Sequence, residues 1–212
     1  MRAPRNLSGP ANVQCSNMHG TESLGLAAPG ATTTVLTDGV VKLRPLQAHD
    51  AAPLFEAISE SLPQLCAWLT WCRPDHALDD CIGFILQSQA DWQKGDQFNF
   101  GIFDAQTGQL LGSVALNQVN RPHNYANLGY WVRTSKAGQG IATASVKLIA
   151  RFGFERLRFT RLEIIVPVGN RPSQRTALKV GAFLEGSLRH RLVLSGQLHD
   201  ASLYSLLPAD FR

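Results

Sequence analysis

The sequence carries little charge. Asp, Glu, Lys and Arg make up 17% of its 212 residues, and the 20 basic and 16 acidic side chains form no long run of one sign. Hydrophobic residues make up 44%, so the chain lacks the low hydrophobicity and high charge of a disordered protein. The net charge of +4 is too dispersed to indicate nucleic-acid binding, although it suits a phosphate-bearing ligand. One folded domain is expected.

Long hydrophobic runs are also missing. No window reaches the roughly 18 continuous apolar residues that span a bilayer, and no apolar stretch of a secretory signal follows the N-terminal arginines. The four cysteines, Cys15, Cys66, Cys72 and Cys81, show no C-x-x-C spacing and no neighbouring histidine cluster. We therefore expect no membrane segment, no metal site and no disulfide framework, and a reducing cytoplasm is the compartment that fits.

Residues 1–37 are rich in small and polar residues without a regular period, so we expect a flexible extension there and a folded domain over residues 38–212. The hydrophobic pattern of that domain predicts elements in the order β-α-α-β-β-β-α-β-α-β-β. Strands are expected at 40–44, 98–103, 109–118, 127–133, 162–166, 182–194 and 198–207, and helices after Asp50 and at 78–94, 139–154 and 173–180. Hairpins make antiparallel pairs and β-α-β crossovers make parallel ones, so the fold class is α/β (α+β) with a mixed sheet.

The most informative segment runs from Gly129 to Thr143, where a strand leads into a turn with Gly138 and Gly140 and then into a helix. Glycines permit positive φ angles and let an anion approach the main chain, and the free N–H groups of the first helical turn attract it. Two glycines before a helix can equally form a simple turn. The motifs of nucleoside-triphosphate and dinucleotide sites, G-x-x-x-x-G-K-[ST] and G-x-G-x-x-G after the first strand, are absent from the sequence.

At this place in the strand order, the segment resembles the phosphate loop of the GNAT superfamily of N-acetyltransferases, with the pattern [Q/R]-x-x-G-x-[G/A]. Residues 137–142 match it except at Ala137, where the pattern has Gln or Arg. The residues before the loop resemble the branch with the Rim-type ribosomal-protein N-terminal acetyltransferases, and the resemblance covers roughly Val40 to Leu207. Its matches, in order, are Leu43-Arg44-Pro45, Trp68-Leu69-Thr70-Trp71, Gly129-Tyr130-Trp131-Val132, Gly169-Asn170-Arg171-Pro172-Ser173 and Gly181-Ala182-Phe183-Leu184-Glu185-Gly186.

The resemblance implies a centrally splayed sheet of six to seven strands with flanking helices, and an enzyme that uses acetyl-CoA and no metal. It implies that main-chain groups of the strand before the loop hold the pantetheine arm and that the loop holds the pyrophosphate. The Asn170 side chain is implied to bond the pantetheine, and its alternative role is to cap the next helix. The expected cofactor-binding residues are Trp131, Val132, Arg133, Ala137, Gly138, Gln139, Gly140, Ile141, Ala142, Thr143, Asn170 and Ser173.

The expected catalytic residues are Ser173, His190 and Glu163. Ser173 matches a serine that this branch places beside the thioester sulfur, where a hydroxyl can protonate the leaving thiolate, and its alternative role is again a helix cap. Many family members use a tyrosine one turn further along, but Ala177 stands there.

The general base is not marked. Relatives carry glutamates at two places where this chain has Asn127 and, near the penultimate strand, Leu192. His190 and Glu163 are therefore the remaining candidates, together with bulk water, because an α-amine with a pKa near 8 is partly neutral at physiological pH.

Trp68, Trp71 and Tyr130 are the expected substrate-binding residues. The tryptophans occupy the segment that overhangs the amine-binding side in this family, although the same spacing is common in an ordinary core. The expected acceptor is the N-terminal α-amine of a ribosomal or other protein, acetylated directly in a ternary complex. A small amine, such as a polyamine, amino acid or aminoglycoside, is the alternative, and a CoA-binding module without catalysis is the alternative from another class. Neither nucleic acid nor membrane is an expected partner, and a homodimer is left open.

Overall fold

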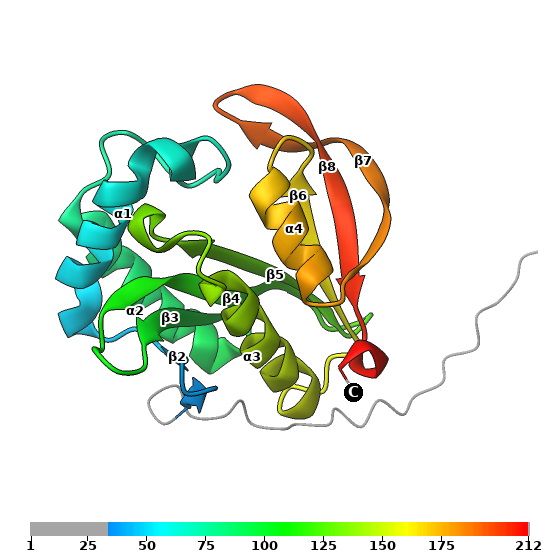
Figure 1. Ribbon diagram of the computed structural model, residues 1–212, viewed down its shortest axis with the longest axis horizontal. Coiled ribbons are helices and arrows are strands. Elements are labelled where there is room, and N and C mark those ends of the chain that lie inside the picture. The colour runs from blue at the N-terminus through cyan, green and yellow to red at the C-terminus, as the bar shows by residue number, and fades with distance from the viewer. Residues whose placement is uncertain (1–33, 212) are drawn as a thin grey trace, which may run out of the picture.

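The computed structural model describes residues 34–211, which form one eight-stranded sheet with the order β1-β2-β3-β4-β5-β6-β8-β7 (Figure 1). The strands are β1 Leu36–Thr37, β2 Val41–Arg44, β3 Phe98–Asp104, β4 Leu110–Asn120, β5 Tyr125–Val132, β6 Arg161–Pro167, β7 Phe183–Leu194 and β8 Gln197–Leu206. The helices are α1 Ala51–Cys66, α2 Leu78–Lys94, α3 Ile141–Glu155 and α4 Arg171–Lys179. Only β5 and β6 pair in parallel, so the mixed sheet is confirmed.

Every strand and helix that the pattern predicts is present, with ends shifted by a few residues. The additional strand is β1, which lies at the end of the predicted extension and pairs with β2 around the turn at Gly39. Two residues are too short to show an alternating pattern, so this strand could not be recognised in the sequence. Residues 1–33, which make up most of that extension, lie outside the described residues.

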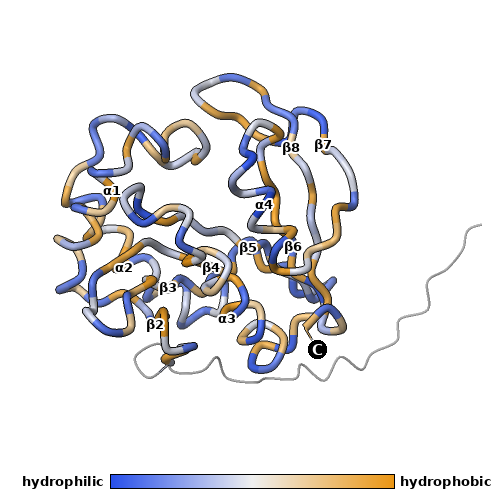
Figure 2. Tube along the Cα trace, in the orientation of Figure 1, coloured by the Kyte–Doolittle hydropathy of each residue, from blue (hydrophilic) through white to orange (hydrophobic). Residues whose placement is uncertain are grey.

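Two hydrophobic cores lie on opposite faces of the sheet. On β4, Val114 and Leu116 point into the larger core, which α3 covers with Val146 and Ile149. The smaller core lies between the sheet and the helices α1 and α2. In Figure 2 the trace of α3 carries both hydrophobic and hydrophilic residues along its length, as expected for a helix with one buried face.

The sheet is splayed at its centre, as the resemblance implies. The parallel pairing of β5 with β6 covers only Tyr125–Asn127 and Arg161–Glu163. Beyond these residues β5 continues along β4 and β6 continues along β8, so the two strands diverge (Figure 1). Their separation leaves an opening between the two halves of the sheet.

The prediction of no disulfide is wrong for one pair of cysteines. Cys66, the last residue of α1, is bonded to Cys72, with the Cα atoms 4.8 Å apart. The chain turns back immediately after α1, where Leu69 N–H donates to Leu65 O, and this reversal brings the two cysteines together. Spacing alone does not show such a reversal. Cys81 is a free, buried cysteine.

Neither a metal site nor a membrane segment is expected from the sequence, and the structure bears on both for the residues it describes. Between residues 34 and 211 no group of three or more His, Cys, Asp or Glu side chains is arranged to hold a metal ion. No helix in this part of the chain is long and apolar enough to cross a membrane.

Candidate active site

A cavity of about 540 Å³ lies where β5 and β6 separate. Its walls come from the segment after α1, from β3, β4 and β5, and from β6, α4 and β7 across the opening. Six of the residues predicted for the site line it, namely Trp68, Trp71, Tyr130, Trp131, Asn170 and Ser173. The structure therefore brings the predicted substrate residues together with Ser173 and Asn170.

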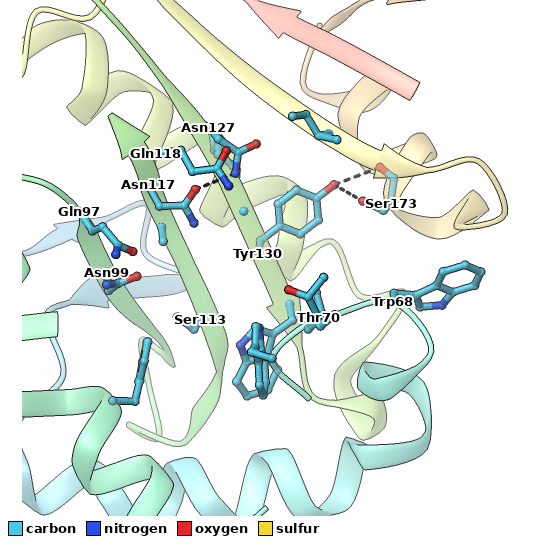
Figure 3. Close-up of a pocket in the computed structure, with 18 of the residues that line it drawn as sticks. Trp68, Thr70, Gln97, Asn99, Ser113, Asn117, Gln118, Asn127, Tyr130 and Ser173 are labelled. Atoms are coloured by element: carbon cyan, nitrogen blue, oxygen red, sulfur yellow. Dashed lines mark hydrogen bonds between the residues drawn. The ribbon is translucent and has the colours of Figure 1, made fainter. Parts of the chain in front are cut away.

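The floor of the cavity is one face of β3, β4 and β5, and strand register determines which side chains meet there. Ala115 stands opposite Asn99 on one side and opposite Gly129 on the other, and Asn117 stands opposite Asn127. The Asn127 amide donates a 2.8 Å hydrogen bond to Asn117 Oδ1, and Figure 3 shows these two side chains beside one another on neighbouring strands. Small residues hollow the floor and neutral amides line it.

A pair of hydroxyl groups joins the two sides of the opening. Tyr130 on β5 places its Oη 2.9 Å from Ser173 Oγ and donates to Ser173 O at 3.0 Å (Figure 3). Burial raises the pKa of Tyr130 above its usual range, so the phenol stays protonated at neutral pH. When Tyr130 donates instead to Ser173 Oγ, the serine hydroxyl is free to donate its own proton to a ligand. These residues lie 43 positions apart, and no sequence spacing indicates their contact.

Asn170 is the N-cap of α4. Its Oδ1 accepts a 3.1 Å hydrogen bond from Ser173 N–H, so the capping alternative is confirmed. Asn170 also lines the cavity, and its amide NH₂ has no partner within residues 34–211. Capping and ligand binding are therefore compatible, because they use different atoms of the same side chain.

The predicted phosphate loop stands outside the cavity at the start of α3. Gly138 and Gly140 have φ angles of 77° and 81°, the left-handed region that favours glycine. The first N–H donated within the helix is that of Ala144, to Gly140 O at 3.0 Å. The N–H groups of Gly138 to Thr143 precede that bond and are left for an anion, whereas the Ala137 N–H already donates to Thr134 O at 3.1 Å. A Cβ atom on either glycine would meet no atom within 4 Å, so the space beside both glycines is open.

Arg133 does not offer the main-chain groups that the resemblance implies. The main-chain N–H of Arg133 donates to Leu111 O at 2.7 Å, and its main-chain carbonyl accepts from Lys136 N–H at 3.0 Å. Its buried guanidinium forms ion pairs with Glu56 and Glu60 of α1. We therefore exclude Arg133 from the cofactor contacts and treat it as the residue that joins β5 to α1.

The carboxylate of Glu60 extends this connection to the loop. Its Oε1 accepts Ser135 N–H at 2.8 Å, and Ser61 Oγ accepts Thr134 N–H at 3.0 Å. The hydrogen bond from Arg133 is the largest cause that lowers the pKa of Glu60 to about 2. Two glutamates four residues apart on one helix face were the available sequence signal, but their partner lies more than 70 residues away.

The tryptophans are not ordinary core residues. The Trp68 ring packs against Gly169 at the end of β6, where an added Cβ would lie 3.1 Å from the ring. Trp71 is 45% exposed, and its ring centroid lies 6.4 Å from that of Trp131. Both side chains line the cavity, and Trp68 spans the opening between the two halves of the sheet.

Neither candidate base lines the cavity. Glu163 accepts a 2.9 Å hydrogen bond from Arg161, two residues before it on the same face of β6. His190 is exposed on an irregular part of β7, and its N–H donates to Asp200 Oδ1. Glu163 stands beside Asn127 in the parallel pair, but Arg161 holds its carboxylate, and His190 lies in the register shift of β7, so neither residue takes the place expected of the base.

The cavity lining holds a single carboxylate within the described chain, that of Asp80. Arg73 donates to both of its oxygens, at 2.7 and 2.8 Å. The pKa of Asp80 is lowered, first by the Ala77 N–H and then by Arg73, so it remains ionised and paired. The cavity lining therefore offers no unpaired carboxylate that could accept a proton.

Comparisons with known proteins agree with this geometry. Residues 41–182 match the family model of the acetyltransferase (GNAT) domain. The putative ribosomal N-acetyltransferase YdaF of Bacillus subtilis is 29% identical over 177 residues, which cover 81% of this chain and 93% of that protein. A putative ribosomal-protein-serine acetyltransferase from Vibrio cholerae is 31% identical with a TM-score of 0.72, over 84% of this chain and 99% of the other. Mycobacterium smegmatis RimJ in complex with CoA-disulfide is 28% identical with a TM-score of 0.78, over 86% and 90% of the two chains. The chain belongs to the GNAT family of acetyl-CoA-dependent N-acetyltransferases.

Proposed function

We propose that this acetyltransferase modifies the N-terminal α-amine of a ribosomal or other protein, by direct transfer from acetyl-CoA. The observation that carries the proposal is that the carboxylate of Asp80, the one carboxylate in the cavity lining of the described chain, is already bound by Arg73. Without a free carboxylate to act as the base, the enzyme needs an amine that is partly neutral in water. At pH 7.4 about a quarter of α-amines are neutral, against about 0.1% of lysine side chains. A polyamine would also find no free carboxylate for its second ammonium group.

The relatives support a protein acceptor. The Bacillus subtilis relative is named as a putative ribosomal N-acetyltransferase and the Vibrio cholerae structure as a putative ribosomal-protein-serine acetyltransferase. An acceptor of this kind would put the reaction in the cytoplasm.

The cofactor residues divide into two groups. The N–H groups of Gly138 to Thr143 would hold the pyrophosphate, while the main chain of Trp131 and Val132 and the Asn170 amide would hold the pantetheine arm. Acetyl-CoA supplies the thioester, whose sulfur leaves as a thiolate and takes up a proton. The positive φ angles and open space at Gly138 and Gly140 fit this assignment.

Ser173 would supply that proton. Tyr130 Oη lies within hydrogen-bond distance of Ser173 Oγ and can replace the proton that Ser173 gives up. The raised pKa of Tyr130 keeps this reserve protonated across the physiological range. The amine is delivered neutral from water, and the proton that its nitrogen must lose after it attacks the thioester passes to water, so no residue has to act as a base.

The proposal is tested by thiol release from acetyl-CoA with three kinds of acceptor. These are a peptide with a free α-amine, the same peptide with a blocked α-amine and an internal lysine, and a set of small amines. Release with the free peptide, with acetylation located at the α-amine by mass spectrometry, is expected. Turnover of small amines only would contradict the proposed acceptor, and no turnover despite thermal stabilisation by acetyl-CoA would indicate a binding module.

A further inference from the structure

The strand β7 carries an irregularity beside the cavity. Leu188 is paired with Ala201 and Leu192 with His199, so three residues of β7, 189–191, stand opposite the single residue Asp200 of β8. Within this bulge His190 has a φ of 49°, a left-handed conformation that is unfavourable for a residue with a side chain. The 2.8 Å hydrogen bond from its N–H to Asp200 Oδ1 holds it there. Bulges beside active sites commonly redirect side chains.

The bulge places one positively charged residue, the exposed Arg191, at the rim of the cavity. Arg191 lines the cavity, while its exposed neighbours Arg189 and His190 do not. Figure 1 shows the β7–β8 hairpin reaching over the opening between α4 and the segment after α1. Arg191 makes no ion pair with any residue in the described range 34–211.

The charged residues around the cavity leave Arg191 without an ion-pair partner within residues 34–211. Arg73 and Asp80 both line the cavity and form an ion pair with each other. The floor presents neutral amides, among them Asn117 and Asn127. An acceptor that enters this cavity therefore meets one uncompensated guanidinium on the β7 side.

We propose that Arg191 binds an acidic side chain close behind the acceptor α-amine, so that the enzyme prefers N-termini with Asp or Glu among their first residues. The proposal rests on the proposed function, because it names the kind of peptide that enters the same site. A guanidinium binds a carboxylate through two parallel N–H donors, an interaction that a neutral side chain cannot reproduce. The constrained conformation at His190 then serves to present Arg191.

The test uses peptides that differ only in having Asp, Asn or Lys at position 2, 3 or 4. The protein is the full chain or one of its variants Arg191→Ala, Arg191→Glu and Arg189→Ala. The wild type is expected to favour Asp over Asn by about fivefold at one of these positions, through a lower KM for the peptide. The preference should shrink at high salt, because the contact lies at an exposed rim.

The variants separate this contact from general surface charge. Arg191→Ala should abolish the preference, and Arg191→Glu should reverse it in favour of Lys, both with the KM for acetyl-CoA unchanged. The control Arg189→Ala should behave like the wild type, because Arg189 does not line the cavity. Equal use of the Asp, Asn and Lys peptides, or an equal loss in Arg189→Ala, would overturn the proposal while the proposed function stands. Failure of every free-amine peptide would overturn both.

Discussion

The two halves of the active site use different parts of the chain: main-chain groups in one half and side chains in the other. In the proposed function, the pyrophosphate side uses main-chain N–H groups from one continuous stretch, Gly138 to Thr143, at the start of α3. The acceptor side uses side chains from widely separated segments, including Trp68 after α1, Asn127 on β5 and Arg191 on β7. The first half depends on backbone conformation, whereas the second depends on which side chains tertiary structure brings together.

The halves also differ in how they treat charge. Ion pairs of the buried Arg133 side chain with the more exposed Glu56 and Glu60 connect α1 to the segment before the phosphate loop. The acceptor cavity instead presents amides and hydroxyls, with its one carboxylate already paired. Substitutions in the first half should therefore alter the KM for acetyl-CoA, and substitutions in the second should alter turnover or the KM for the acceptor.

The largest effect is expected where the halves meet, at Ser173. Ser173→Ala should lower kcat about 100-fold, the usual contribution of a positioned proton donor, and leave the KM for acetyl-CoA nearly unchanged. The measurement is steady-state thiol release from pH 6 to pH 9. Tyr130→Phe should lower kcat less, and the double variant should be no slower than Ser173→Ala, because the two hydroxyls act in series. Full turnover of Ser173→Ala at every pH would exclude the serine as donor.

The next effect concerns the cofactor half alone. Gly140→Val forces a branched side chain into a left-handed position, at a cost of about 1–2 kcal/mol, and places it where an anion would approach. The Kd for CoA, measured by calorimetry, should rise at least about tenfold. Gly39→Ala is a matched control, since Gly39 also has a positive φ and open space but lies in the β1–β2 turn. An equal loss of affinity in both variants would point to instability and not to the loop.

The contrast between local backbone features and contacts of distant segments also explains which features the sequence could predict. The end of α2 was predicted correctly, because an amphipathic run followed by Gly95 in a left-handed C-cap is a local signal. The splayed sheet followed from the family resemblance, whereas the glycines of the phosphate loop were an equally local signal. Such features depend on a few neighbouring residues.

Pairings between distant segments could not be predicted. The contact of Tyr130 with Ser173 and the ion pairs of Arg133 join residues 43 to 77 positions apart. His190 and Glu163 were expected as bases for their chemistry, but a bulge and a neighbouring arginine keep them from the cavity. A residue type indicates which chemistry is available, whereas register and loop reversal decide where it is used.

A smaller effect is expected from the support of the loop. Glu60→Gln keeps the shape of the side chain but removes the charge that pairs with Arg133. It should raise the KM for acetyl-CoA about threefold and lower the stability at pH 7 by at most about 1 kcal/mol, since Glu60 is partly exposed. The measurements are steady-state kinetics and thermal unfolding between pH 7 and pH 2.5. An unchanged KM for acetyl-CoA would show that this carboxylate does not position the loop.

The pH dependence of the stability tests the role of Glu60 further, and Glu185 provides a control. The pKa of Glu60 is about 2 in the folded protein and about 4.3 when unfolded, so its stabilisation is present above pH 4.3 and is lost as the pH falls toward 2. The pKa of Glu185 is also lowered to about 2, by Arg161 on the other half of the sheet. Both Glu60→Gln and Glu185→Gln should reduce the loss of stability in this window. Only Glu60→Gln should change the KM for acetyl-CoA.

The smallest effect is expected from the disulfide between Cys66 and Cys72. It closes the short loop that carries Trp68 and Trp71, so its removal should leave these side chains to be ordered by the acceptor. The double variant Cys66→Ser/Cys72→Ser should raise the KM for the acceptor about threefold and leave that for acetyl-CoA unchanged. Reduction with dithiothreitol should reproduce this change in the wild type and have no effect on the variant. A rise in both KM values would instead show that the loop supports the two halves together, and the separation between them would then fail.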